Sequence, residues 1–235
     1  MIFIKKYRNE WKYILSNQDL SLLKSRLSNV LEYDSHSTNG KYFIHSLYFD
    51  DYFNTSLHTT DSGVSKRYKW RIRYYDNDLS YLVLEKKEKL EGRCHKKSCR
   101  LTMDEYNLIV SSNISELMYD TNKDLIKELC VDMMMYDYCP KVIIDYERIA
   151  FVEEITNVRI TFDMKISASY QLDRFLLGDY NKFLVDTNNM NVLEVKFDEI
   201  LPSYIRNIVE SYGYVQTSFS KYMYGRKLMN GVMLW

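Results

Sequence analysis

The chain has 235 residues, and its 32 Lys and Arg residues equal its 32 Asp and Glu residues, so the formal net charge is zero. A nucleic-acid-binding protein usually carries a basic excess, so this charge balance argues against that class. The length suits one large β-rich domain or two small ones, with room for a substantial core. Tyr is frequent (22 residues) while Gly (7) and Pro (2) are scarce, which favours strands and helices over long flexible segments.

The sequence predicts a soluble, cytoplasmic protein that does not insert into a membrane. Its N-terminus lacks the long apolar stretch of a signal peptide, and no apolar run approaches the length of a membrane span. The four Cys residues match no zinc-binding spacing and are expected to be reduced thiols. Any coupling to a membrane would need a separate partner, and the sequence leaves the oligomeric state open.

The first part of the chain reads mainly as strands. These are expected over residues 3–15, 42–49, 66–75 and 81–89. Ser16 and Asp19 resemble a capping box, which predicts a helix after the first strand. The apolar side of that helix would be formed by Leu20, Leu23, Leu27 and Val30. Residues 50–64 read as a loop or short helix, and residues 91–100 as a basic run after a turn.

The second part combines helices and strands. Thr102 and Glu105 form a clearer capping box, which predicts a helix to about residue 111. Further helices are expected over 123–135, from Pro202 to Gly213, and over 219–229. Strands are expected over 141–151, 157–166 and 191–197, with a loop at 173–182 between the last two.

One stretch, VRITFDMKI at 158–166, shows the pattern that organises the chain. Every second residue from Val158 to Ile166 is apolar, and the residues between are Arg159, Thr161, Asp163 and Lys165. Successive side chains of a strand point to opposite faces, so this strand has one apolar and one charged face. A charged face of an antiparallel sheet is usually exposed to water, and a solvated sheet is therefore the simplest alternative.

The same alternation returns in at least six segments, with similar residue types. The charged and polar positions are Arg8, Glu10, Lys12, Arg71, Arg73, Glu85, Lys87, Lys89, Tyr146, Arg148, Glu194 and Lys196. If such a sheet closes on itself, the apolar faces pack outward against helices and the charged faces line the interior. This arrangement inverts the usual small barrel. An interior rich in Arg and Lys needs an anion, because unpaired buried charges are costly.

Nine motifs in order resemble the VTC domain, the polyphosphate-polymerase branch of the CYTH, or triphosphate tunnel metalloenzyme, superfamily. They are RNEWKY at 8–13, SLYFDD at 46–51, KWRIRYY at 69–75, LEKKEK at 84–89 with Gly92 and Lys96, DYER at 145–148, RITFD at 159–163, LEVKFD at 193–198, LP at 201–202 and SKY at 220–222. Each motif alone is weak. Their order over nearly the whole chain makes the resemblance strong.

The resemblance implies an α+β fold in which an eight-stranded antiparallel β-barrel forms a tunnel with helices packed outside, as a single domain over residues 1–235. It also implies transfer of the γ-phosphoryl group of ATP to a growing polyphosphate chain, with Mn²⁺ or Mg²⁺ as the metal. Phosphoryl transfer depends mainly on positioning and charge stabilisation, which suits a tunnel of Arg and Lys. The partners implied are ATP and polyphosphate or triphosphate.

Carried over by motif, the resemblance implies a role for each of three groups of residues. The phosphate-binding residues taken as catalytic are Lys12, Arg71, Arg73, Lys87, Arg148 and Lys221. Further substrate-binding residues are Lys89, Lys96, Tyr146, Arg159, Lys196 and Ser220. Glu194 is implied as a metal ligand, with Glu10, Glu85 and Asp163 as metal partners or orienting carboxylates.

Two points stay open at this stage. The hydrolytic and cyclase members of the superfamily typically begin with Glu-x-Glu-x-Lys, whereas this chain has Arg8 at the first position. That change weakens the case for a two-metal hydrolytic site, although a triphosphate hydrolase and an inactive polyphosphate-binding module remain as alternatives. In LEKKEK either Lys86 or Lys87 could face the tunnel, and alternation with Glu85 favours Lys87.

Overall fold

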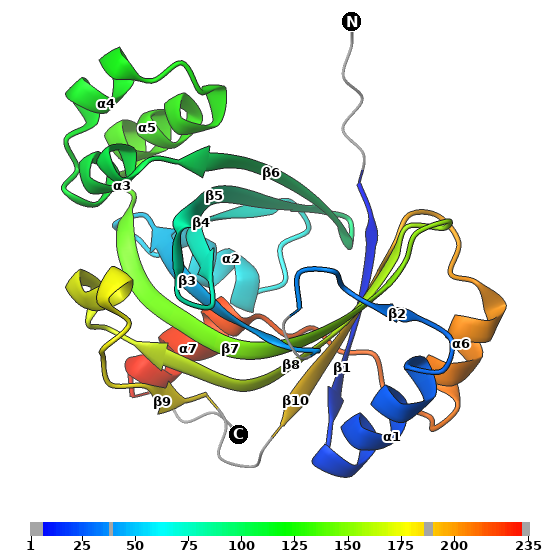
Figure 1. The fold of residues 1–235 in the computed structure, drawn as a ribbon. Helices are drawn as coiled ribbons and strands as arrows, with labels where there is room; N and C mark the ends of the chain where they lie inside the picture. The colour runs from blue at the N-terminus through cyan, green and yellow to red at the C-terminus, as the bar shows by residue number, and fades with distance from the viewer. Residues whose placement is uncertain (1–6, 38–39, 186–189, 232–235) are drawn as a thin grey trace, which may run out of the picture.

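The centre of the computed structural model is a curled antiparallel sheet (Figure 1). The structure describes residues 7–37, 40–185 and 190–231. The main path of the sheet runs through β1 (Asn9–Leu15), β10 (Asn191–Phe197), β8 (Val158–Ser169), β7 (Cys139–Glu153), β3 (Tyr42–Asp50), β4 (Arg67–Tyr75), β5 (Asp78–Leu90) and β6 (Arg93–Leu101). Two short strands extend it: β2 (Glu32–Tyr33) pairs with β7, and β9 (Phe183–Leu184) pairs with β8.

The two ends of this path come together, which turns the sheet into a barrel. The backbone amides of Arg8 and Cys94 each donate to the other residue's carbonyl oxygen at 2.9 Å. Arg8 lies just before β1 and Cys94 lies in β6, so the outermost strands are joined at this point (Figure 1). The predicted eight-stranded antiparallel tunnel fold is therefore confirmed.

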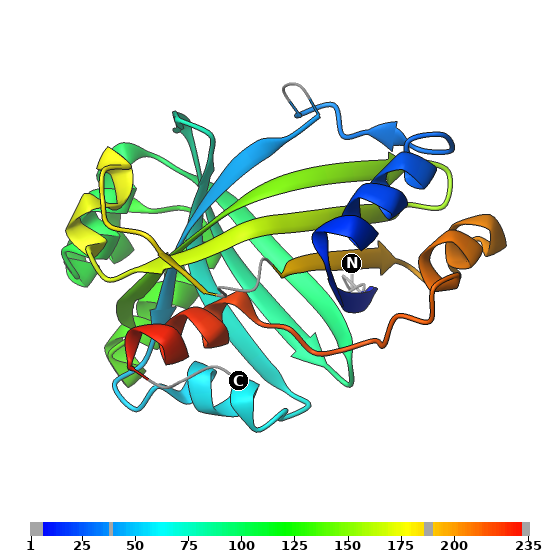
Figure 2. The ribbon, with the colours of Figure 1, turned by 90° about the horizontal axis from the view of Figure 1, so that it is seen from below.

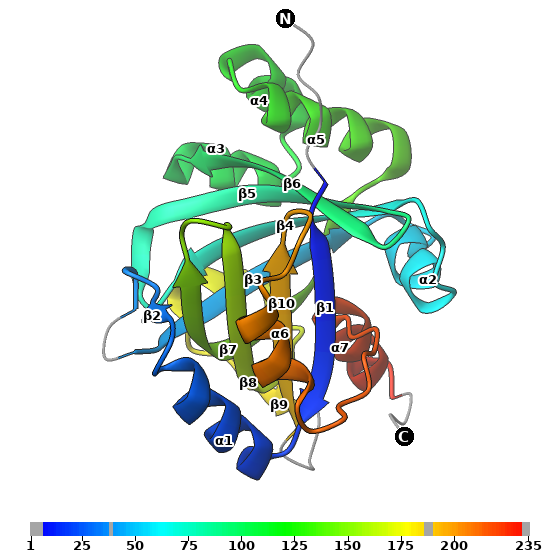
Figure 3. The same cartoon turned by 90° about the vertical axis from the view of Figure 1, so that its right-hand side faces the viewer.

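Helices cover the outside of the barrel in three groups (Figure 3). The first group is α1 (Asn17–Leu27) and α6 (Ser203–Glu210), which pack on the apolar side of β1, β8 and β10. The second is α3 (Met103–Val110), α4 (Ile114–Asp120) and α5 (Asp124–Tyr136), near β4, β5 and β6. The third is α2 (Thr55–Asp61) and α7 (Lys221–Met229), which lie side by side (Figure 2).

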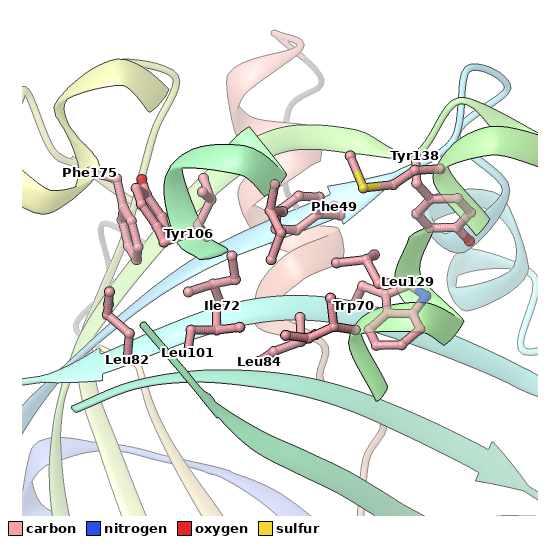
Figure 4. Close-up of a cluster of buried hydrophobic side chains, with 14 of the residues drawn as sticks. Phe49, Trp70, Ile72, Leu82, Leu84, Leu101, Tyr106, Leu129, Tyr138 and Phe175 are labelled. Atoms are coloured by element: carbon pink, nitrogen blue, oxygen red, sulfur yellow. The ribbon is translucent and has the colours of Figure 1, made fainter. Parts of the chain in front are cut away.

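The outward apolar faces of the strands form the core. In the largest cluster, Trp70, Ile72 and Leu84 of the sheet pack with Leu129 of α5 and with Phe175 of the 3₁₀ helix η1 (Leu172–Leu177) (Figure 4). In another, Phe162 of β8 packs with residues of α1 and α6. The predicted inversion of the barrel is therefore present: apolar side chains point outward under helices, and charged side chains point inward.

The alternation predicted for 158–166 holds until the middle of β8 and then breaks. Val158, Ile160 and Phe162 are buried on the apolar side. Lys165 has a positive φ of 50°, and the β7–β8 register shifts between Asp145 and Glu147. The extra residue lets Lys165 reach Glu147 at 2.7 Å, and its side chain is mostly exposed. This bulge is the physical reason that strict period two fails here.

Several other expectations needed correction. The basic run at 91–100 was not predicted to be a strand, yet β6 pairs along its length with β5. Its Lys, Arg and Ser residues carry little strand preference, so pairing with the neighbouring strand determines its structure. Helix α4 was also missed.

Both capping boxes are confirmed, at Ser16 and at Thr102. The predicted start of the first strand, 3–6, lies outside the described residues. Within the described residues, no helix is both long and apolar enough to span a membrane.

The packing of α5 can be tested by truncating one side chain. Leu129 is fully buried between α5 and the sheet (Figure 4). Leu129→Ala should lower the free energy of unfolding by about 2–5 kcal/mol, because it leaves a cavity in a close-packed core. Met134→Ala on the same helix, where the native side chain is 63% exposed, should change it by less than about 0.5 kcal/mol. Urea unfolding measures both; equal losses would contradict the packing described.

Candidate active site

The interior of the barrel holds a cavity of about 650 Å³. Strands β1, β4, β5, β7 and β10 contribute to its wall, together with residues 216–223 before and within α7. The predicted site residues that line it are Glu10, Lys12, Arg71, Arg73, Lys87, Lys89, Tyr146, Arg148, Glu194, Lys196, Ser220 and Lys221. The structure thus brings together side chains from sequence positions that are more than 200 residues apart.

The first group in the cavity is built on Glu10 and Glu194. In the β1–β10 pairing, Glu10 lies opposite Lys196 and Lys12 lies opposite Glu194. The Lys12 ammonium lies between the two carboxylates, 3.2 Å from Glu10 Oε1 and 3.4 Å from Glu194 Oε2. Lys87 reaches Glu10 at 2.6 Å, and Lys196 forms an ion pair with Glu194. Two carboxylates therefore share three ammonium groups.

Electrostatics keep both carboxylates of this group ionised. Burial opposes ionisation, but the surrounding Lys charges are stronger and hold the pKa of Glu10 and of Glu194 below the ordinary range. Burial also acts on Lys196, whose pKa falls to about 8 despite the attraction of Glu194 and Glu10. The group therefore places two ionised carboxylates and three Lys side chains together in the cavity wall.

The second group consists of Arg71 and Arg73 on β4, held by Glu85 on β5. Arg71 Nε donates to Glu85 Oε2 at 2.6 Å, and Arg73 Nη1 lies 3.7 Å from the same oxygen. Tyr48 and Tyr146 accept hydrogen bonds from Arg71 and Arg73, respectively, both at 2.9 Å. Although burial opposes it, the two guanidinium groups hold the pKa of Glu85 well below its usual value. Glu85 orients these Arg side chains.

The third group joins Arg148 and Lys221 through Asp163. Arg148 donates to both carboxylate oxygens of Asp163, at 2.6 and 2.7 Å, and Lys221 reaches Asp163 Oδ2 at 2.6 Å. Asp163 is completely buried. Burial opposes its ionisation, but Arg148 and Lys221 lower its pKa to about 2. Both oxygens are used by these cations, so Asp163 acts as an orienting carboxylate.

A polar network holds α7, the helix that carries Lys221, in place. Tyr222 donates to Asp50 at the end of β3, and Arg226 donates to the Tyr222 hydroxyl at 2.9 Å and to Asn54 at 2.7 Å. Gly225 permits a close approach to the sheet, because a Cβ there would lie 2.2 Å from Ile144 Cδ1. These contacts hold the first turn of α7 against the cavity.

Four predicted residues lie outside the cavity lining: Glu85, Lys96, Arg159 and Asp163. Lys96 contacts Glu85 at 2.8 Å, with about half of its side chain exposed. Arg159 donates to the Tyr42 hydroxyl at 2.9 Å and pairs with Asp34. Neither cation reaches the group around Glu10.

The choice between Lys86 and Lys87 is settled by their positions. Lys87 lines the cavity, as alternation with Glu85 favours. Lys86 points to the outside of the barrel, where its ammonium contacts Glu128 of α5 at 2.8 Å and lies 4.0 Å from the centre of the Tyr68 ring. The two adjacent lysines therefore serve different faces of one strand.

Sequence reasoning missed Lys69, a half-buried cation in the cavity wall. Its ammonium donates to Ser220 Oγ at 3.0 Å, at the N-terminus of α7. Burial, followed by the charges of Lys12 and Lys87, holds the pKa of Lys69 well below its usual value. The signal was available, because Lys69 has the same strand parity as Arg71 and Arg73. Arg67 and Tyr48 line the cavity too and were also missed.

Only one part of the cavity offers oxygen ligands that suit a hard divalent cation. Among the described residues, no group of three or more His, Cys, Asp or Glu side chains is placed to hold a metal ion. Glu10 and Glu194, however, both face the cavity as ionised carboxylates. Mg²⁺ is commonly bound by one or two carboxylates with substrate phosphates and water as the other ligands. These two residues fit that arrangement.

Comparisons with known proteins agree with this geometry. The model of the VTC domain family matches residues 7–230. No curated protein sequence matches the chain. A candidate adenylyl cyclase from Hippeastrum with a dominant triphosphatase activity is similar in structure, with a TM-score of 0.56, 14% identity and 97% of each chain covered. A candidate adenylate cyclase from Bacillus halodurans gives 0.54 and 12%, with 92% of this chain and 95% of the other covered.

The buried pairing of Asp163 predicts a pH-dependent stability. The lowered pKa of Asp163 contributes stability that is complete above its ordinary value of 3.8 and is lost as the pH falls towards 2. At pH 7, Asp163→Asn should lower the free energy of unfolding by about 3–5 kcal/mol, because it leaves Arg148 and Lys221 without their carboxylate. The difference from wild type should narrow at pH 3.

The matched control is Asp179→Asn. Asp179 is exposed and pairs with Arg174 at the surface, so its removal should change stability by less than about 1 kcal/mol. Urea unfolding at pH 7 and pH 3 measures all three proteins. If wild type and Asp163→Asn differ in their free energy of unfolding by the same amount at both pH values, Asp163 is not the ionised partner of Arg148 and Lys221 described here.

Proposed function

Because the chain belongs to the VTC domain family, we propose that it is an ATP-dependent polyphosphate polymerase that acts in this cavity. The single observation that supports the proposal most strongly is the set of inward-facing cations held in fixed positions by buried carboxylates. A linear polyanion would neutralise the cations that these carboxylates leave in excess. Arg presents a planar fork that matches phosphate oxygens, and Lys supplies a compact charge.

In the proposed reaction, the terminal oxygen of the polyphosphate chain attacks the γ-phosphorus of ATP. A new P–O bond forms as the bond to the bridging oxygen of the β-phosphate breaks, and ADP leaves. The transfer therefore needs no protein nucleophile. Arg71, Arg73 and Arg148 would hold the phosphate oxygens, while Lys12 and Lys221 would stabilise the charge that develops during transfer.

Glu10 and Glu194 are the residues that would hold the divalent metal, Mn²⁺ or Mg²⁺. When bound, such an ion neutralises charge on the phosphates and helps to orient them. Lys12 and Lys87 keep both carboxylates ionised and in place, through the contacts described above. Tyr146 and Ser220, which also line the cavity, would donate hydrogen bonds to phosphate oxygens.

The position of Arg8 supports polymerisation over a two-metal hydrolysis. Its guanidinium pairs with Asp198 at 2.9 Å and donates to the carbonyl oxygen of Asn157. Arg8 is thus directed away from the cavity, and β1 supplies a single carboxylate, Glu10, to the lining. Glu10 and Glu194 together suit one bound metal better than two, and Asp61, the third carboxylate of the lining, pairs with Lys227.

The Arg residues of β4 provide one test. Arg71→Ala and Arg73→Ala should each lower the rate of ADP formation from ATP by about 100-fold or more, because each removes a fixed donor at the transferring phosphates. Both proteins should stay folded, because in each variant Glu85 keeps Lys96 and the remaining Arg as partners. Arg100→Ala, which removes an exposed cation from β6, is the control and should retain wild-type activity. Wild-type rates in both β4 variants would contradict the proposal.

The role of Glu194 is tested by metal dependence. Glu194→Gln keeps the size of the side chain but removes its charge, so the Mn²⁺ concentration for half-maximal activity should rise by about tenfold or more. Glu199→Gln, at an exposed position in the following loop, should leave the metal dependence unchanged. Identical Mn²⁺ titrations for wild type and Glu194→Gln would exclude Glu194 as a metal ligand.

A further inference from the structure

Six large apolar side chains are exposed together where α5 ends and where β3 leads into α2. They form the apolar patch and are between 48% and 76% exposed: Tyr52, Phe53, Val131, Met134, Met135 and Tyr136. The two segments meet because the Tyr52 amide donates to the Tyr136 carbonyl oxygen at 3.4 Å. The rings of Tyr52 and Phe53 also contact each other edge to face, with their centroids 5.2 Å apart.

On α5 the apolar patch follows one side of the helix. Val131, Met134 and Met135 are spaced at i, i+3 and i+4, which places their side chains next to one another. The other side of α5, with Leu125 and Leu129, is buried against the outside of the barrel (Figure 3). The described residues of one chain therefore leave a second apolar side of α5 uncovered.

The size of the apolar patch is that of an interaction surface. A fully exposed aromatic side chain presents roughly 150–250 Å², so the three aromatic members alone present roughly 400 Å². The Val and Met members enlarge the patch towards the roughly 800 Å² that each partner buries in a stable protein–protein interface. The composition agrees, because aromatic residues and Met are enriched in such interfaces. The patch is therefore large enough to form one side of an interface.

The charges around the apolar patch favour a second copy of this chain as the partner. The exposed charged residues of α5 and its C-cap are Asp124, Lys127 and Asp137. A surface that enters an anionic membrane usually surrounds its apolar residues with Lys and Arg, whereas this surface carries more acid than base. The chain as a whole has no net charge, so two copies do not repel each other through an excess of either sign.

An antiparallel pair of α5 helices also brings opposite charges together. Lys127 precedes the exposed apolar side chains of α5, and Asp137 follows them. A two-fold axis that crosses the helix midway between these residues places Lys127 of one copy opposite Asp137 of the other. The reverse contact follows by symmetry, because both copies use the same surface. Near the axis, Val131 of one copy then meets Met134 of the other.

We propose that the apolar patch is the interface of a symmetric homodimer, in which the α5 helices of two copies pack antiparallel. Tyr52 and Phe53 extend the contact on either side of the helix pair. The cavity stays open in the dimer, because α5 packs on the outside of β5 and β6 whereas the candidate site faces the interior of the barrel. Dimerisation is therefore independent of the proposed function.

Sedimentation equilibrium of the purified full chain, over about 1–100 μM, tests the interface. One chain has a mass of 28.3 kDa, and the wild-type protein should approach twice that mass within this range. Val131→Glu places two carboxylates close together near the two-fold axis, so it should raise the dissociation constant by about 100-fold or more. The control is Ile155→Glu, in the turn between β7 and β8. Ile155 is 95% exposed and lies outside the patch, so the dissociation constant should not change.

An exchange of charges tests the antiparallel arrangement. Lys127→Glu and Asp137→Lys should each raise the dissociation constant by about tenfold, because each puts like charges opposite each other. The double variant Lys127→Glu/Asp137→Lys restores opposite charges and should recover the wild-type value. Thermal unfolding establishes that every variant is folded. The small effect of Met134→Ala on unfolding, given above, applies to the monomer, at protein concentrations well below the dissociation constant.

Three results would overturn the proposal. These are a wild-type protein that keeps the mass of one chain at every concentration, a dimer that Val131→Glu leaves intact, and a double charge variant that dimerises no better than the single ones. Sedimentation with vesicles of phosphatidylcholine and phosphatidylserine provides a fourth. If the wild-type protein is a monomer that binds these vesicles and Val131→Glu does not, the apolar patch serves a membrane instead of a second copy.

Discussion

The structure depends on the pairing of buried charges inside the barrel. Removing a partner from a buried ion pair is strongly destabilising, since the remaining charge has lost its water without compensation. Four carboxylates each contact at least two cations, and the side chain of each is no more than 5% exposed: Glu10, Glu85, Asp163 and Glu194. These carboxylates let Arg and Lys side chains face inward before any ligand binds. They also hold those side chains in defined directions, which phosphoryl transfer requires.

The same pairing explains why the helices lie outside. With the interior occupied by charge, the apolar faces of the strands must be covered from the other side, and three helix groups do this. One of those groups has a second role. Helix α7 packs on β7 and β8, and at its N-terminus Ser220 and Lys221 line the cavity. One helix therefore contributes both to the apolar core and to the candidate site.

Much of this arrangement could be predicted from the residues. Period-two alternation placed Arg71, Arg73 and Lys87 inside, and the ordered motifs gave the family. The approach failed where neighbours rather than local sequence decide the structure. Strand β6 has a basic, Ser-containing sequence with little strand preference, and its pairing with β5 makes it a strand. The bulge at Lys165 needs the β7–β8 register, which no local pattern contains. Lys69 was accessible to parity reasoning and was simply not singled out.

Separating the proposed metal ligands from the orienting carboxylates was beyond the sequence. Glu85 and Asp163 resemble Glu10 and Glu194 in residue type and strand parity. The difference lies in three-dimensional contacts, because Arg148 takes both oxygens of Asp163 and Arg71 takes Glu85. Glu10 and Glu194 pair with flexible Lys side chains and remain part of the cavity lining.

The most direct test of the central claim is product analysis with the wild-type protein. Purified protein is incubated with ATP and Mn²⁺, the products are separated on a gel stained for polyphosphate, and ADP and free phosphate are measured in parallel. Polymerisation predicts a ladder of long chains, with ADP formed for each phosphate added and little free phosphate. Free phosphate without a ladder would contradict it and indicate a triphosphate hydrolase, and binding of polyphosphate without any turnover would indicate a module that has lost catalysis.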